Sequence, residues 1–115
     1  MIDVSVEKFE ELVAAALDGI PPAIGHLIDN VAVFVEEGRE DASLLGLYQG
    51  VPLTNRENYG IGGAMPDRIT IYRLPILAQC GSEADVIEAV RITVVHEVGH
   101  HFGLSDARLR ELGYG

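Results

Sequence analysis

The stretch HEVGHHFGLSD, residues 96–106, decides how the rest of this 115-residue chain has to fold. His96 and His100 are four residues apart, which on an α-helix places them about 40° apart on one face and one turn apart along the axis. Two imidazole rings in that arrangement can bind one tetrahedral Zn²⁺. Glu97 lies about 100° around the helix from His96, so it points beside such a metal, where a water molecule would be held.

A third ligand has to come from beyond this helix, and Asp106 is the candidate. If the helix continued, Asp106 would lie about 9 Å further along the axis than His100, which is out of reach. Glycine enters a left-handed conformation cheaply and ends helices, so we predict that the chain turns back at Gly103 and brings Asp106 to the metal. Asp is also a favoured N-cap, so capping of a following helix is the alternative interpretation of Asp106.

The motif is specific. From this chain's own residue frequencies, HExxH is expected by chance in about 1% of such chains, and the longer pattern with Gly and then Asp or His in about one in ten thousand. We therefore favour metal ligation over the alternative that His96 and His100 are hydrogen-bonded core histidines. His101 lies about 100° from His100 and is expected beside the site or at the surface. His26 has no partner motif and is expected to be a structural or surface residue.

Working outward from the motif, Ser82 is expected to cap a helix that ends near Gly103. Its apolar residues recur at steps of three and four and cover most of its circumference, so this helix should be central in the fold. The other predicted elements are helices over about Val6–Leu17 (capped by Ser5), Ala23–Asp29, Pro75–Cys80 and Asp106–Leu112, strands over Val31–Val35, Leu44–Gln49 and Arg68–Tyr72, and a long loop over Thr54–Asp67. Residues 1–115 therefore read as one domain, with helices packed on a small sheet.

Composition restricts the partners and the compartment. The net charge is −10, and the eight Lys and Arg residues are scattered, so we expect neither nucleic acid nor an anionic membrane surface as a partner. There is no apolar run long enough to cross a membrane and no visible secretory signal. Cys80 is the only cysteine, so an intrachain disulfide is excluded, and we expect a buried, apolar Cys80 and a cytoplasmic protein.

These residues resemble the zincin metallopeptidases whose motif is HExxHxxGxxH or HExxHxxGxxD, here in the Asp version. The chain is more closely similar to a bacterial family of very small zincin-like metallopeptidases, over residues 44–53, 66–73 and 93–112. The resemblance implies an α+β fold with a small mixed sheet of three to four strands above a central HExxH helix. It implies Zn²⁺ bound by His96, His100 and Asp106, with Glu97 as the catalytic base.

The resemblance also implies that a strand beside the cleft pairs with an extended peptide, and Arg68–Tyr72 is our candidate for that strand. We expect a peptide or unfolded-protein substrate and a monomeric enzyme. The Met-containing turn of the larger metzincins has no counterpart after Asp106, because Met1 and Met65 both lie upstream. Tyr59, Arg68 and Tyr114 are candidate oxyanion donors between which the sequence does not choose.

Two rival interpretations share the same motif. One is a non-catalytic zinc-binding or regulatory module with the same metal site. The other is a metal-dependent ribonuclease, since another small bacterial family uses a related histidine-rich motif on RNA. That family has a third His where this chain has Asp106, and the charge of −10 argues against an RNA substrate.

Overall fold

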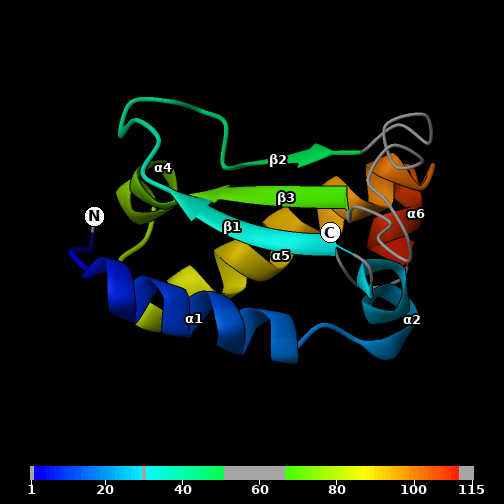
Figure 1. Cartoon of the computed structure of the whole chain (residues 1–115), viewed down its shortest axis with the longest axis horizontal. Coiled ribbons are helices and arrows are strands. Elements are labelled where there is room, and N and C mark those ends of the chain that lie inside the picture. The colour runs from blue at the N-terminus through cyan, green and yellow to red at the C-terminus, as the bar shows by residue number, and fades with distance from the viewer. Residues whose placement is uncertain (1, 30, 51–66, 112–115) are drawn as a thin grey trace, which may run out of the picture.

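A three-stranded mixed sheet with helices packed against it forms the fold of the computed structural model, which describes residues 2–29, 31–50 and 67–111 (Figure 1). The strands are β1 (Val31–Glu36), β2 (Gly46–Gln49) and β3 (Asp67–Tyr72), in the order β1-β3-β2. β1 pairs with β3 in parallel, and β2 pairs with β3 antiparallel. The predicted α+β class with a small mixed sheet is confirmed.

β3 lies in the middle of this sheet, which overturns one expectation. All six of its residues are in register with β1, and Arg68 to Ile71 are also in register with β2. Both of its edges are therefore hydrogen-bonded. Ile69 and Ile71 are fully buried, and Thr70 between them, which is flanked by Phe34 of β1 and Leu47 of β2, is only 3% exposed. The prediction that Arg68–Tyr72 offers a free edge to a peptide is wrong.

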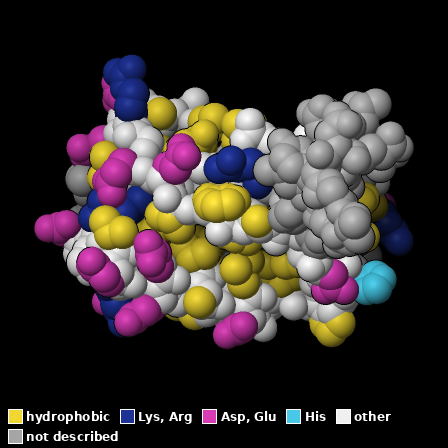
Figure 2. Space-filling model, viewed as in Figure 1, with side chains coloured by type: hydrophobic (Ala, Val, Ile, Leu, Met, Phe, Trp, Pro, Cys, Tyr) yellow, Lys and Arg dark blue, Asp and Glu magenta, His cyan; other side chains and the backbone are white. Residues whose placement is uncertain are grey.

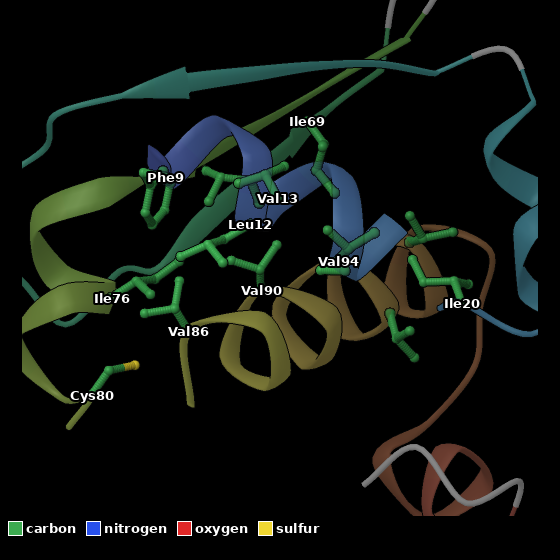
Figure 3. Packing of buried hydrophobic residues seen from close by; sticks show 14 of the residues in the cluster. Phe9, Leu12, Val13, Ile20, Ile69, Ile76, Cys80, Val86, Val90 and Val94 are labelled. Carbon is green, nitrogen blue, oxygen red and sulfur yellow. The ribbon is translucent and has the colours of Figure 1, made fainter. Parts of the chain in front are cut away.

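The HExxH motif lies on α5 (Glu83–His101), the longest helix, which Ser82 caps by accepting a hydrogen bond from the Asp85 N–H. In Figure 1, α5 runs behind the sheet and alongside α1 (Val6–Asp18), which Ser5 caps. The helices pack through apolar side chains that point toward one another, with sheet residues above them (Figure 3). The labelled members include Phe9, Leu12 and Val13 of α1, Val86, Val90 and Val94 of α5, and Ile69 of β3. The central position predicted for this helix is confirmed.

The shorter elements differ in detail from the prediction. The expected helix over residues 23–29 is split into α2 (Pro22–Gly25) and a 3-10 turn, η1 (His26–Ile28). Helix α4 (Arg73–Ala78) begins two residues before Pro75, because proline is tolerated in a first helical turn. Strand β2 begins at Gly46, two residues later than expected. Most of the predicted loop over Thr54–Asp67 lies outside the described residues.

Two further expectations concern burial and membranes. Cys80 is 2% exposed, which confirms its predicted burial. No helix in the described part of the chain is both long and apolar enough to span a membrane.

Candidate metal site

The two motif histidines lie in the last two turns of α5. Their ring centroids are 5.9 Å apart, with the ring planes tilted by 54°. Nε2 of His96 is buried and has no hydrogen-bond partner among the described residues. A buried polar atom without a partner is costly, so it is rare in native proteins unless something else satisfies it. A metal ion is such a partner, and the lone pair of His96 Nε2 therefore fits a ligand role.

The chain turns back directly after these histidines, as predicted from Gly103. Gly103 has a φ of +83°, in the left-handed region. The Leu104 N–H donates to the Gly99 carbonyl at 2.7 Å, and the Gly103 N–H donates to the His100 carbonyl at 3.1 Å. This pair of bonds is a Schellman motif, in which a left-handed residue after the helix satisfies the last carbonyls.

Helix α6 (Asp106–Glu111) follows the turn and is fixed against α5 by Leu109. Leu109 is fully buried, and a Cβ placed on Gly99 would lie 3.0 Å from its Cδ2. The Ser105 hydroxyl accepts the Arg108 N–H at 3.1 Å and so caps α6. The cap is therefore Ser105, and the carboxylate of Asp106 is left for another partner.

That partner is His100. Asp106 Oδ1 lies 2.7 Å from His100 Nε2. The hydrogen bond with His100 is the main cause that lowers the pKa of Asp106 below its usual value, and the nearby charges of His100, His96 and Arg110 act in the same direction. Both side chains are about half exposed, at 48% for His100 and 60% for Asp106, so the pair is open to solvent.

The other motif histidine, His96, is not part of this hydrogen-bonded pair. Within residues 2–29, 31–50 and 67–111, no three His, Cys, Asp or Glu side chains already surround one point as closely as a bound metal ion requires. The structure brings His100 and Asp106 into contact and places His96 one turn away on the same helix. Ligation of one metal by all three residues stays a prediction.

Glu97 faces the outer edge of β2. Its Oε1 accepts a hydrogen bond from the Tyr48 N–H at 3.3 Å. The carbonyl of Leu45 accepts from the Tyr72 N–H, so along this antiparallel pair Leu45 and every second residue after it turn their backbone groups toward β3. Gly46 and Tyr48 therefore turn theirs outward. A Cβ on Gly46 would lie 2.6 Å from Cγ2 of Thr93, so β2 lies against α5 at a distance that only glycine allows.

Tyr48 also joins β2 to the end of α5 through its side chain. Its ring stacks on His101, with centroids 4.0 Å apart and an interplanar angle of 25°. Its hydroxyl donates to Asp67 Oδ2 at 2.8 Å, and His101 Nε2 lies 3.9 Å from that oxygen. Neither Tyr48 nor Asp67 is among the predicted site residues. The available signal was that they lie in residues 44–53 and 66–73, the two upstream segments that resemble the family.

A cavity of about 230 Å³ adjoins the motif on the side where β2 begins. It is lined by Ser43, Leu44, Leu45, Gly46, Ile92, Thr93, His96 and Glu97. Leu44, Leu45 and Ile92 form its apolar wall, while the other side chains that line it, which include His96 and Glu97, are polar. The cavity is therefore suited to an apolar group held next to the candidate catalytic base.

The remaining candidates lie elsewhere. The Arg68 guanidinium lies 4.3 Å from the ring centroid of Phe34, on the β1 side of the sheet, so it is turned away from Glu97. Tyr59 and Tyr114 lie outside the described residues. The side chain of His26 is 84% exposed and lies 3.5 Å from Asp29, as expected for a surface histidine.

Similarity to a known family and to a solved structure extends over most of the chain. The family model for zincin-like metallopeptidases matches residues 28–115, which contain the sheet, α5 and α6. A solved structure of a conserved hypothetical protein from Thermo thermophilus is similar over 85% of this chain and 94% of that one, with 27% sequence identity and a TM-score of 0.52. No curated protein matches. With its helix-borne HExxH motif, the glycine turn and a family match over most of its length, this chain belongs to the zincin-like metallopeptidase family.

Proposed function

We propose that this protein is a zinc-dependent metallopeptidase that hydrolyses peptide bonds in peptides or unfolded chains. One observation carries the proposal. The turn at Gly103 returns Asp106 to within 2.7 Å of His100 Nε2, although a continued helix would hold the two apart. A helix cap does not require that contact, because Ser105 already caps α6. A shared metal ion would require the two side chains to lie this near each other, with the ion in place of the direct hydrogen bond.

His96, His100 and Asp106 are the residues that would hold the metal, and their two nitrogens and one oxygen are donors that Zn²⁺ accepts. Bound zinc would supply the Lewis acidity that polarises the scissile carbonyl and makes water nucleophilic near neutral pH. The direct hydrogen bond between His100 and Asp106 would be exchanged for ligation. The unpaired Nε2 of His96 would gain its missing partner.

Glu97 would act as the general base. Its carboxylate takes a proton from the attacking water and passes it to the leaving amine. The Tyr48 N–H, which donates to Oε1, holds the carboxylate beside the 230 Å³ cavity that Glu97 lines. Because this donor belongs to the backbone of β2, the orientation of Glu97 depends on how closely that strand lies on α5.

The outer edge of β2 is the better candidate for the strand that pairs with substrate, in place of Arg68–Tyr72. Gly46 and Tyr48 present backbone groups there, directly above the motif. A peptide added along this edge would be recognised mainly through its backbone. A carbonyl of the peptide would replace the Glu97 carboxylate as the acceptor of the Tyr48 N–H. An apolar side chain of the peptide would then occupy the 230 Å³ cavity. Broad specificity with an apolar preference follows from this arrangement.

The test uses Glu97→Gln with Glu83→Gln as its matched control, because Glu83 lies on the same helix, away from the site. Glu97→Gln should bind one zinc per chain, since Glu97 is not a ligand, and should lose at least about 100-fold in hydrolysis of a peptide library. Glu83→Gln should retain both. Full activity of zinc-loaded Glu97→Gln would contradict the proposal.

A zinc-binding module without turnover is the second candidate, since the Tyr48 N–H and the Glu97 carboxylate already satisfy each other. Stoichiometric zinc in the wild-type protein without cleavage of any library peptide would favour it. Both candidates remain compatible with a monomeric, cytoplasmic protein.

A further inference from the structure

A second hollow, larger than the cavity beside the motif, lies at the opposite edge of the sheet, away from the metal site. It is a groove of about 490 Å³ between α1 and β1. Its α1 wall consists of Glu10, Val13, Ala14 and Leu17, and its β1 wall consists of Val33, Phe34 and Val35. Hydrophobic side chains gather in this region in the space-filling view (Figure 2). Six of the seven lining residues are apolar, and Phe34 at the rim is 44% exposed.

The groove runs along an open edge of the sheet. β1 is an outer strand, and among the described residues its backbone pairs with β3 alone. A β-strand with one partner leaves every second N–H and C=O facing outward, and such an edge is a template for another strand. Proteins usually protect long apolar edges with charges, prolines or bulges. Between Val31 and Val35 there is no charged residue and no proline.

On the α1 side one carboxylate, Glu10, lines the groove, and helix spacing places two more on the same ridge. Glu7, Glu10, Ala14 and Asp18 follow one another at steps of three and four, so they share one ridge of α1. All four are exposed, and no ion pair among the described residues includes Glu7, Glu10 or Asp18. Glu11, four residues after Glu7 on the same side of the helix, does have a basic partner, since its carboxylate lies 3.5 Å from Lys8 Nζ. Positive charge at the groove comes from Arg68, whose guanidinium lies over Phe34 on the sheet side. The α1 side of the groove is thus negative.

From these observations we infer that the α1–β1 groove binds an extended, basic segment of a partner protein, which adds to β1 as a fourth strand. Alternate side chains of this segment would pack on Val13, Ala14 and Leu17. Its lysines or arginines would face Glu10 and the neighbouring carboxylates of the α1 ridge, which form no ion pair with the part of the chain that the structure describes. A second copy of this chain fits poorly, because pairing of β1 with β1 would bring together two acidic ridges on molecules that each carry a charge of −10.

This surface is separate from the proposed catalytic site. The metal-site residues lie at the outer edge of β2, whereas the groove lies at the outer edge of β1, with β3 between the two strands. Binding in the groove needs neither zinc nor Glu97, so the inference stands or falls independently of the proposed peptidase activity.

A synthetic peptide tests the inference with the intact, purified protein. The probe has three valine–threonine pairs flanked by two lysines at each end, and its control has glutamates in place of the lysines. Binding is measured by fluorescence anisotropy and mapped by amide chemical shifts. We expect the lysine peptide to bind at least tenfold more tightly than the glutamate peptide at low salt, with shift changes in β1 and α1. Added salt should weaken that binding.

Two variants with the same change in charge supply the decisive comparison. Ala14→Lys places a cation in the groove, while Ala15→Lys places one on the neighbouring exposed position, which does not line it. Ala14→Lys should weaken binding of the lysine peptide at least fivefold, and Ala15→Lys should weaken it less than twofold. Equal effects of the two variants, equal affinity for the two peptides, or shift changes confined to β2 and α5 would overturn the inference. So would a dimer through β1, detected by sedimentation, that binds neither peptide.

Discussion

Tyr48 joins β2 to both α5 and β3, since its N–H donates to Glu97, its ring stacks on His101 and its hydroxyl donates to Asp67. Tyr48→Phe removes only the last of these contacts. The Asp67 side chain is 15% exposed, so its carboxylate would lose a hydrogen bond in a largely buried place. We expect a loss of about 1–3 kcal/mol in the free energy of unfolding, measured in urea.

Tyr72→Phe is the control for that measurement. Tyr72 lies on β3 and is also partly buried, but no hydrogen bond of its hydroxyl is found among the described residues. Its substitution should change the free energy of unfolding by less than about 0.5 kcal/mol. If both variants lose the same amount, the bond from Tyr48 to Asp67 contributes nothing specific to stability.

At this scale the sequence allowed part of the site to be predicted. The turn at Gly103 and the return of Asp106 follow from helix geometry and the conformational freedom of glycine, which act over a few residues. The N-cap of α6 could not be predicted, because Ser and Asp are both favoured caps and only the structure assigns the role to Ser105. Tyr48 and Asp67 could not be paired from local patterns, because the residues in contact are 19 positions apart.

Among the elements, the contact between β2 and α5 determines how closely the strand lies on the motif helix at the proposed site. Gly46→Ala would place a methyl group 2.6 Å from Cγ2 of Thr93 and 3.2 Å from the carbonyl oxygen of Thr70. Thr93 cannot rotate away cheaply, because its hydroxyl donates to the Ala89 carbonyl at 2.7 Å. The strand has to move, and we expect a loss of about 1–3 kcal/mol in the free energy of unfolding.

A double-mutant cycle identifies the cause of that loss. Thr93→Ser removes the clashing methyl group and keeps the hydroxyl, so Gly46→Ala should cost about 1 kcal/mol less in the Thr93→Ser background. Gly19→Ala is the control, because a Cβ there meets nothing closer than 3.6 Å. An unchanged cost in the Thr93→Ser background would show that the clash is with the β3 backbone instead.

The existence of the strands and helices could be predicted, whereas the order of the strands could not. Hydrophobic periodicity and caps such as Ser5 and Ser82 mark individual elements. The alternation in Arg68–Tyr72 indicates one buried face, yet Thr70 is buried as well. The neighbours of β3 on both sides come from distant segments, and periodicity along one strand carries no information about them.

At the scale of the whole molecule, Cys80 reports on global unfolding. It is buried, and its burial is the main cause that raises the pKa of its thiol, with the charge of Asp85 acting in the same direction. The native thiol should therefore react slowly with a disulfide reagent and become reactive when the core opens. Zinc that binds only the folded state, at about 100 times its Kd, should stabilise that state by about 2.7 kcal/mol. Labelling through global unfolding should then slow by roughly 100-fold.

Asp106→Ala provides the control, because it removes a proposed ligand from the exposed start of α6. Its labelling rate should respond to zinc far less than that of the wild-type protein. A wild-type rate that does not change with zinc would show that the folded protein gains no stability from the metal.

The return of α6 toward α5 depends on the handedness of one backbone position and not on the space around it. Gly103 has a φ of +83°, and no atom lies within 4 Å of a Cβ built there. A natural alanine would thus be strained only by its chirality, at about 1–2 kcal/mol, whereas its mirror-image form would be accommodated without rearrangement. The separation between the second histidine and the returning aspartate therefore depends on the stereochemistry of this position, and a side chain of natural configuration there would strain it against the packing of Leu109.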